Sequence, residues 1–218
     1  MIFTDKLFKI ILDVGSIGPN YIPGHAHADT LTFEMCFKND KFIVNSGIST
    51  YQSSKQRLYE RGTSAHNTVT VNNENSSDVW SSFRVGRKAR IVKVNLNKSN
   101  QKYKIQAIHD GYNKILSKNL HERNWVIKKK SLEINDKITD KRKTGVANFI
   151  LHPSVKIKRL GKNLNLMFNN ESVLFTACKN EFEIIKKPYL PQFNKIIYTN
   201  CISVKLKNGF SKVIFNWD

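Results

Sequence analysis

Residues 30–38 read TLTFEMCFK, and they lie within the longer segment GHAHADTLTFEMCFKNDKFIVN, residues 24–45. Apolar side chains occupy every second position of this run: Leu31, Phe33, Met35 and Phe37. Since successive side chains of a β-strand point to opposite faces, a period of two predicts a strand with one buried face. This strand is the starting point for predicting both the fold and the functional region.

Three of the six histidines lie near this strand, at positions 25, 27 and 66. His25, His27 and Asp29 share the parity of the apolar positions, so a backbone extended back to residue 25 would place them on the core side. Polar groups at the edge of an apolar face commonly bind a ligand or form a buried network. We therefore expect the function of the chain to depend on this segment.

The rest of the chain is also predicted to be mostly strand. Further strands are expected at residues 7–13, 41–45, 66–72, 89–96, 102–109, 123–135, 146–151, 154–159, 164–168, 172–177, 181–186, 196–206 and 212–217, with expected turns that include Asn39-Asp40, Asn135-Asp136, Pro188 with Pro191, and Asn208-Gly209. A short helical turn is expected at residues 55–60, capped by Ser53 or Ser54, and residues 73–88 are expected to form a long polar loop. Many short strands with little helix predict an all-β fold, an antiparallel β-sandwich, forming a single domain over residues 1–218.

Composition narrows the possible partners and compartments. No apolar run approaches the roughly 20 residues that span a bilayer, and no secretory signal peptide is apparent, because Asp5 interrupts the N-terminal run. The cysteines at positions 36, 178 and 201 form neither a disulfide framework nor a CxxC pattern. The formal net charge of +19 favours a polyanionic partner, or else reflects a lysine-rich solvated surface. Nucleic acid is not expected, because no RNA-binding signature and no recognition-helix pattern is present.

Seven segments, in order along the chain, carry a family resemblance. They are GHAHADTLTFE (24–34), FIVNSGISTY (42–51), RGTSAHNTVTVN (61–72), NSSDVWSSFRVGRKAR (75–90), HDGY (109–112), HERNW (121–125) and LHPS (151–154). Together they resemble the C-terminal β-sandwich domain of the heparinase II/III family of polysaccharide lyases. The resemblance implies a sandwich that follows an N-terminal (α/α) toroid, with the substrate cleft between the two.

The resemblance also implies an activity and a location. Enzymes of this family cleave uronic-acid polysaccharides, such as heparan-type chains or alginate, by β-elimination, and they are typically periplasmic or secreted. The toroid supplies an asparagine and a tyrosine to the chemistry. This sequence contains no toroid, so the chain is expected to be one part of an enzyme and to have little activity alone.

His25 matches the histidine that the sandwich contributes in this family. β-Elimination needs a group that neutralises the uronate carboxylate, a base for the carbon-bound proton and an acid for the leaving oxygen. The resemblance implies that His25 is catalytic, as a base or as a neutralising donor, and histidine titrates in the required pH range. The alternative is a histidine that only hydrogen-bonds a loop to the core.

His27, Asn45 and His66 match the family's metal ligands, which are histidine, an acid and histidine. Two imidazoles and an oxygen suit Zn²⁺, with water in the fourth position. Asn45 stands where many relatives have aspartate, and a neutral amide is a weaker ligand than a carboxylate. The zinc ion would be structural, because β-elimination needs no metal-bound hydroxide; a metal-free hydrogen-bonded cluster is the alternative.

The expected hairpin at residues 39–40 complicates this metal site. It would pair Asn45 with Glu34, so His27 could reach Asn45 only if the chain bends sharply between residues 27 and 29. Asp29 is therefore an alternative ligand, or a carboxylate that orients an imidazole.

Three further residues are candidates for binding substrate: Arg61, Tyr59 and Arg84. Arg61 could hold a uronate carboxylate with two hydrogen bonds, or form a structural ion pair. Tyr59 could donate a phenolic proton, as could Tyr51, although such tyrosines are more often packing residues. Arg84 lies in a loop with Trp80 and Arg87, a combination that suits both the rings and the acids of sugars, and equally a solvated turn.

Three functions are compatible with these patterns. The favoured one is the C-terminal domain of a polysaccharide lyase, whose partners would be an acidic polysaccharide and the toroid. The second is a non-catalytic module that binds an acidic glycan, and the third is a folded fragment without activity. Binding of an acidic polysaccharide that weakens with salt would separate the second from the third.

Overall fold

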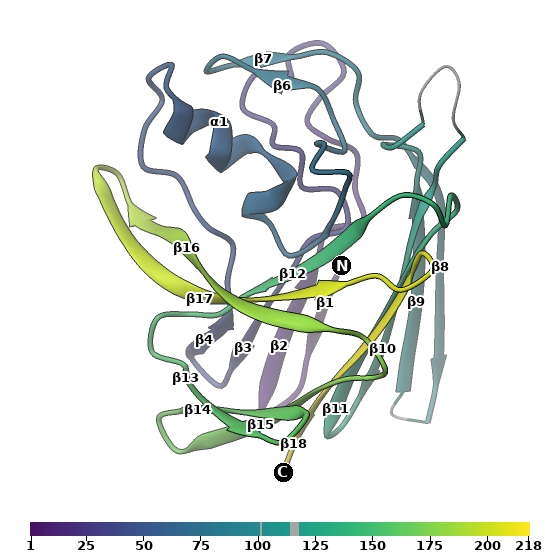
Figure 1. Ribbon diagram of the computed structural model, residues 1–218, viewed down its shortest axis with the longest axis vertical. Helices are drawn as coiled ribbons and strands as arrows, with labels where there is room; N and C mark the ends of the chain where they lie inside the picture. The colour runs from purple at the N-terminus through teal and green to yellow at the C-terminus, as the bar shows by residue number, and fades with distance from the viewer. Residues whose placement is uncertain (101, 114–117) are drawn as a thin grey trace.

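The computed structural model describes residues 1–100, 102–113 and 118–218, which form the antiparallel all-β fold that the sequence predicts (Figure 1). The strands are β1 (Ile2–Thr4), β2 (Phe8–Leu12), β3 (Phe33–Phe37), β4 (Asp40–Ile43), β5 (Val69–Val71), β6 (Val79–Trp80), β7 (Arg84–Val85), β8 (Ile91–Ser99), β9 (Lys102–His109), β10 (His121–Lys128), β11 (Ser131–Ile138), β12 (Gly145–Ile150), β13 (Lys156–Leu160), β14 (Asn163–Phe168), β15 (Glu171–Ala177), β16 (Phe182–Gln192), β17 (Lys195–Lys205) and β18 (Phe210–Trp217). Helix α1 spans Lys55–Arg61 and is followed by a 3₁₀ turn at Thr63–Ala65. No helix in the described part of the chain is long and apolar enough to cross a membrane.

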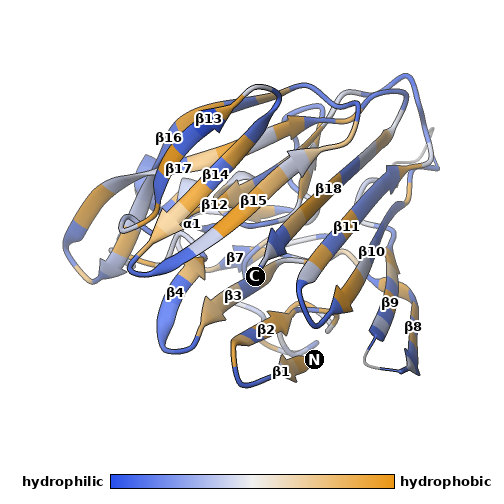
Figure 2. Ribbon diagram, turned by 90° about the horizontal axis from the view of Figure 1, so that it is seen from below, coloured by the Kyte–Doolittle hydropathy of each residue, from blue (hydrophilic) through white to orange (hydrophobic). Residues whose placement is uncertain are grey.

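The strands form one large sheet and two smaller ones. The large sheet has the order β13-β14-β15-β18-β11-β10-β9-β8, and the smaller sheets have the orders β1-β2-β3-β4 and β16-β17-β12-β5. The two smaller sheets meet where Ile43 bridges Leu151 and the Val44 amide donates to the Ile150 carbonyl at 2.9 Å. Together they cover one face of the large sheet (Figures 1 and 2).

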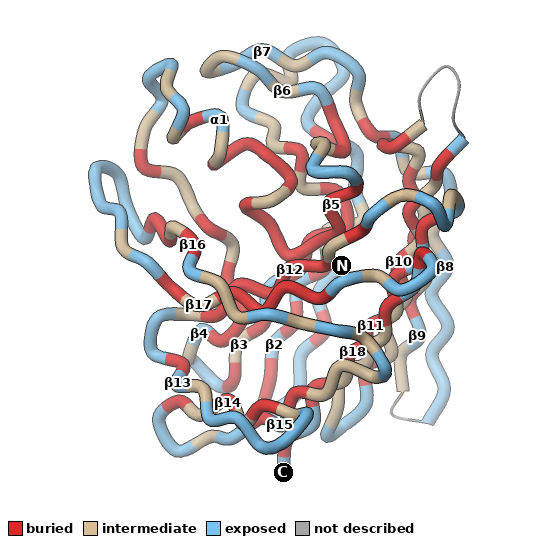
Figure 3. The backbone as a smooth tube through the Cα atoms, viewed as in Figure 1, coloured by how far each residue is buried: buried red, intermediate tan, exposed pale blue. Residues whose placement is uncertain are grey.

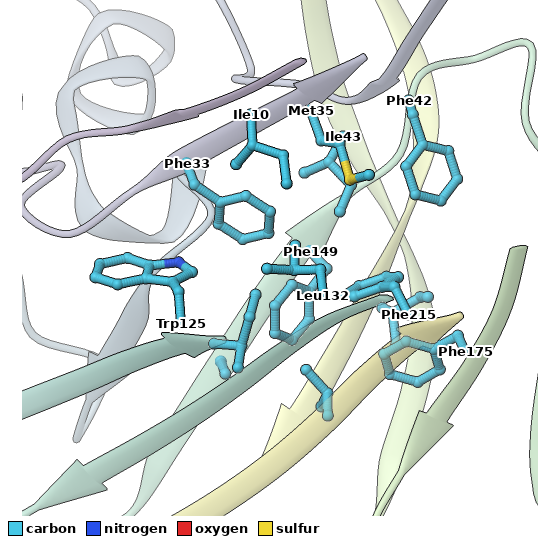
Figure 4. Packing of buried hydrophobic residues seen from close by; sticks show 14 of the residues in the cluster. Ile10, Phe33, Met35, Phe42, Ile43, Trp125, Leu132, Phe149, Phe175 and Phe215 are labelled. Carbon is cyan, nitrogen blue, oxygen red and sulfur yellow. The ribbon is translucent and has the colours of Figure 1, made fainter. Parts of the chain in front are cut away.

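The core lies between these layers. Phe33 and Met35 of β3 point toward Trp125 of β10 and Phe149 of β12, and all four side chains are at most 1% exposed (Figure 4). Hydrophobic and hydrophilic residues alternate along β10, β11 and β18, which buries one face of each strand (Figures 2 and 3). Burying one large apolar side chain contributes about 1.5–3 kcal/mol, so this packing is a main source of stability.

Two predicted boundaries in the second half of the chain are wrong. The single strand expected at residues 123–135 is two strands, β10 and β11, which turn at Lys129–Lys130. Asn135-Asp136, expected to be a turn, lies inside β11, where the buried Asp136 carboxylate accepts hydrogen bonds from His121 and Arg123. These tertiary bonds outweigh the local preference of Asn and Asp for turns.

The prolines near residue 190 also do not end a strand. β16 continues through Pro188 and Pro191 to Gln192, although a turn was predicted there. β16 is an edge strand, with β17 as its only neighbour in the sheet order of the described residues. A proline without an amide hydrogen is tolerated at an edge, so β16 and β17 form a long hairpin beside α1 (Figure 1).

The predicted strand at residues 30–38 begins later than expected. β3 starts at Phe33, and Leu31 has φ of 63°, a left-handed conformation that ends extended geometry. Residues 25–29 are therefore loop rather than strand. The loop expected at residues 73–88 contains the short ribbon β6–β7, which lies with α1 at one end of the sandwich (Figure 1).

Candidate functional site

Helix α1 buries three charged side chains at the end of the sandwich where the β6–β7 ribbon lies. The Ser54 hydroxyl caps the helix by accepting from the Arg57 amide at 3.1 Å. Arg57, Glu60 and Arg61 are fully buried. Their spacing of three and four residues places them on one side of a short helix, which faces inward.

The glutamate on this helix is held by the segment that follows β4. Oε1 of Glu60 accepts from the Ser49 amide at 3.1 Å and from the Ser49 hydroxyl at 2.5 Å. Its Oε2 has no hydrogen-bond partner and lies 3.8 Å from Nη1 of Arg57. The helix and residues 46–54 therefore form one unit around a buried ion pair.

The loop that carries His25, His27 and Asp29 is anchored from below. The Ala28 amide donates to the Arg61 carbonyl at 2.8 Å, and the Ala28 carbonyl accepts from the Thr63 hydroxyl at 2.7 Å. Because Leu31 turns the chain, the loop folds over α1 instead of continuing the strand. This is the sharp bend that a metal site including His27 was predicted to need, although it centres on Leu31.

His25 reaches the surface in a polar pocket. The pocket has a volume of about 290 Å³ and is lined by Asp13, Ser16, Ile17, Gly18, His25, Ala26, His27 and Asp29. The imidazole of His25 also packs against Tyr51 and Phe83, with ring centroids 5.4 and 5.1 Å away. A histidine at an open pocket beside carboxylates can exchange protons with a bound ligand.

His27 and His66 form a pair behind this pocket. Their ring centroids are 5.3 Å apart, and Nη1 of Arg57 lies 3.5 Å from Nε2 of His27. Burial, and then the charge of Arg57, lowers the pKa of His27 to about 4. Complete burial lowers the pKa of His66 well below its ordinary value, so both imidazoles are neutral at physiological pH.

The predicted zinc ligands are brought together in part. Both ring nitrogens of His66 are buried without a hydrogen-bond partner, so one of them is available to bind a ligand. Asn45 lies in the same region, because Ser46 donates to the Ala65 carbonyl and the Val44 carbonyl accepts from Asn67. Met35 pairs with Ile43 across an irregularity in the β3–β4 register, so the pairing of Asn45 with Glu34 that a 39–40 hairpin predicted is offset by one residue.

Other features of this region oppose a cation. Nε2 of His27 faces the Arg57 guanidinium, and the buried Lys187 ammonium adds to the positive surroundings of His66. Among the residues that the structure describes, no three His, Cys, Asp or Glu side chains are arranged to hold a metal ion. His66 could still supply a nitrogen ligand, whereas His27 could do so only through Nδ1, because its Nε2 faces Arg57, and the zinc site stays a prediction.

Asp29, the alternative ligand, lines the pocket with His25. Burial, together with the nearby charge of Asp13, raises the pKa of the Asp29 carboxyl to about 7. Burial also raises the pKa of Asp13. Two carboxyl groups that repel each other retain protons at higher pH than isolated ones, so this pocket can hold or release a proton near neutrality.

The three predicted substrate-binding residues lie in different environments. Arg61 is fully buried, and its guanidinium donates to the carbonyls of Ala26, Trp80 and Ser81 at 3.1–3.2 Å. The Tyr59 hydroxyl is buried without a hydrogen-bond partner, and burial raises its pKa. Arg84 is exposed on β7. Arg61 thus joins the loop that carries His25, His27 and Asp29 (the histidine loop) to the β6–β7 ribbon, while Arg84 is open to solvent.

The sequence prediction missed two residues that organise the site. Arg57 contacts His27. Its spacing of four residues from Arg61, next to the predicted helical turn, could have indicated that both arginines lie on the same side of a helix. Asn67 is fully buried: its side chain donates to the carbonyls of Phe33 and Val44 and accepts from the Ile150 amide. No local pattern marks Asn67, because its partners come from three distant segments.

A buried network of hydrogen-bonded side chains on the large sheet supports the site. The Gly111 amide donates to Nδ1 of His109, Nε2 of His109 lies 3.0 Å from Nδ1 of His121, and Nε2 of His121 lies 2.8 Å from Asp136. With both imidazoles neutral, Nε2 of His109 donates to Nδ1 of His121, and Nε2 of His121 donates to the Asp136 carboxylate.

Arg123 connects this network of side chains to the loop that carries His25, His27 and Asp29. Its Nε and Nη2 bind both oxygens of Asp136, at 2.7 and 2.9 Å. Its Nη1 donates to the carbonyls of Leu31 and Asn67, the residues that flank the segments carrying His27 and His66. The large sheet therefore fixes the backbone of the site.

Comparisons with known proteins agree with this architecture. The family model described as heparinase II/III-like, C-terminal, matches residues 1–212. The solved structure of heparan sulfate lyase HepC from Pedobacter heparinus is similar over 96% of this chain and 33% of that chain, with 16% identity and a TM-score of 0.75. Heparinase III, the BT4657 gene product, is similar over 98% of this chain and 35% of its own, with 16% identity and a TM-score of 0.71.

At this level of identity the solved structures establish the fold. The chain spans about a third of the length of these lyases. No curated protein matches the sequence significantly. The match of the family model over nearly the whole chain places it in the heparinase II/III-like C-terminal domain family.

Proposed function

We propose that this chain is the sandwich part of a polysaccharide lyase that cleaves uronic-acid-containing polysaccharides by β-elimination and is completed by an N-terminal (α/α) toroid. The observation that carries the proposal is the position of His25, which lines an open polar pocket with Asp13 and Asp29. His66 is fully buried, and His27 lies beside a guanidinium, so neither is as well placed to meet a substrate.

The chemistry requires charge neutralisation and two proton transfers. His25 would take the proton from the carbon next to the carboxylate, or donate a hydrogen bond to that carboxylate. A protonated Asp29 in the same pocket suits acceptance of an acidic sugar, because a neutral carboxyl does not repel it. Arg84 could meet a uronate carboxylate, whereas Arg61 would act by holding the loop of His25, since its donors already bind carbonyls. Tyr59 would need to move to donate its proton to a substrate.

The proposed zinc ion would be structural, held by His27, His66 and the side-chain oxygen of Asn45. It would join the histidine loop to the strand ends without taking part in proton transfer. Neither of the proton transfers described above requires it. A periplasmic or secreted location, as in the family, is part of the same proposal.

A non-catalytic glycan-binding module is the second candidate, favoured by the net charge of +19. The experiment that separates the two is a lyase assay on heparan sulfate, alginate and hyaluronan, following ultraviolet absorbance of the unsaturated uronate product. We expect no cleavage by this chain alone and cleavage after fusion to a toroid domain of the family. Cleavage by the chain alone would contradict the need for a toroid. Binding without cleavage in both forms would favour the module.

A further inference from the structure

We propose that Tyr51, Phe83 and Phe193 form a sugar-binding subsite, in which the rings take the apolar face of a pyranose unit next to the one held at His25. The proposal rests on the proposed function and adds a residue, Phe193, from a part of the chain that carries no functional motif. The three side chains are called the aromatic cluster below.

The aromatic cluster is assembled from three separate segments. Tyr51 follows β4, Phe83 lies in the turn between β6 and β7, and Phe193 is at the tip of the β16–β17 hairpin. The centroid of the Tyr51 ring lies 5.6 Å from that of Phe83 and 5.0 Å from that of Phe193. Since His25 contacts both Tyr51 and Phe83, the cluster borders the pocket described above.

The rings remain accessible although they touch one another. Tyr51, Phe83 and Phe193 are 41%, 42% and 50% exposed. Large aromatic side chains are normally mostly buried in a folded domain, and a group of them left half-exposed beside a polar pocket is typical of a binding surface.

Contacts with the buried Arg57 and with the backbone hold the aromatic cluster in place. The guanidinium carbon of Arg57 lies 5.2 Å from the Tyr51 ring centroid and 5.8 Å from that of Phe83, so one buried cation supports both rings. The hairpin tip is tied to the same unit, because Asn194 donates to the Ser49 carbonyl at 2.9 Å. Side chains that are already ordered lose little entropy when a ligand binds.

A sugar is the ligand that this chemistry fits. The ring faces carry partial negative charge and attract the weakly positive C–H groups on the flat face of a pyranose. The same polymer carries carboxylates, which match the exposed Arg84 on β7 and the net charge of +19. An acidic polysaccharide therefore satisfies both the aromatic cluster and its cationic surroundings, whereas an apolar protein surface would satisfy only the rings.

The test compares Phe193→Ala with Phe210→Ala. Phe210 lies on β18 and is 44% exposed, so it controls for loss of a similar side chain elsewhere. Equilibrium binding of the chain to heparan sulfate, alginate and hyaluronan is measured at low and high salt. We expect F193A to weaken binding by about tenfold at both salt concentrations, because an apolar contact is not screened, while F210A binds like the wild type and F193W recovers affinity.

Equal binding by F193A and the wild type would overturn the subsite without affecting the proposed lyase function. The subsite would also be overturned if F193A weakened only the association with a separately produced toroid domain, which would make the cluster a domain interface. Failure of the wild-type chain to bind any of the three polysaccharides would overturn the subsite, whereas the lyase assay on the toroid fusion judges the proposed function separately.

Discussion

Nη1 of Arg57 lies 3.5 Å from Nε2 of His27, so two basic groups face each other behind the candidate site. A guanidinium can only donate, so in the metal-free protein Nε2 of His27 acts as an acceptor and the imidazole proton is on Nδ1. This contact and burial keep His27 neutral, with a pKa of about 4. Of His25, His27 and His66, His25 is therefore the candidate for proton transfer.

A structural zinc ion would be revealed by its effect on stability. We expect purified protein to contain zinc, and a chelator to lower its melting temperature, while His66→Ala abolishes both properties. For a chain of this size each 1 kcal/mol lost lowers the melting temperature by roughly 2–4 °C. His152→Ala, outside the site, should retain the metal. Absence of metal by elemental analysis, with no response to chelator, would leave a metal-free cluster around His66.

Asp136→Asn is expected to be one of the more damaging polar substitutions. It removes the charge that compensates Arg123, whose side chain is fully buried. Breaking one partner of a buried ion pair costs about 3–5 kcal/mol, which denaturant titration would measure. Asp140→Asn is the matched control, because Asp140 pairs with the largely exposed Arg142 and its loss should have little effect. Equal stability of the two variants would mean that Asp136 does not hold Arg123 as described.

The buried histidines predict loss of stability in acid. Burial is the largest cause that lowers the pKa of both His109 and His121, so the unfolded chain binds more protons than the native state below the ordinary histidine pKa of about 6.5. The free energy of unfolding should therefore fall as the pH is lowered from about 6.5 toward 5. Nuclear magnetic resonance should show no titration of either ring in the native protein over that range. A midpoint near the ordinary value for either ring would contradict the assignment of neutral imidazoles.

His25→Ala should separate catalysis from folding. In a toroid fusion that cleaves polysaccharide, we expect this variant to lose a factor of about 10²–10⁴ in turnover, the usual contribution of a positioned acid or base. Its melting temperature should change little, because His25 lies at an open pocket. His152→Ala serves again as control. Undiminished cleavage would exclude His25 from the reaction.

Helix α1 should depend on its N-terminal cap. Ser54→Ala removes the hydroxyl that accepts from the Arg57 amide and should cost about 1 kcal/mol. Ser53→Ala, one residue earlier and exposed, is the control and should have a smaller effect. If the two variants melt alike, the cap does not contribute to the stability of the chain.

The sequence alone determined the local features of the fold. The alternation at Leu31, Phe33, Met35 and Phe37 identified a buried face, and these four side chains are at most 1% exposed. Asn208 and Gly209 marked a turn, and both have positive φ. Ser54 was one of two candidates for the cap of the short helix. Such features can be predicted from the sequence because they depend on neighbours within a few residues.

Tertiary structure decided which distant groups meet. Asp136 lies within a strand rather than a turn because Arg123 and His121 bind it, and Leu31 adopts a left-handed conformation where its carbonyl accepts from Arg123. Phe193 meets Tyr51 only because β16 continues through its prolines as an edge strand. These outcomes depend on how the two layers pack and on where buried polar groups find partners, and neither is encoded in a local pattern.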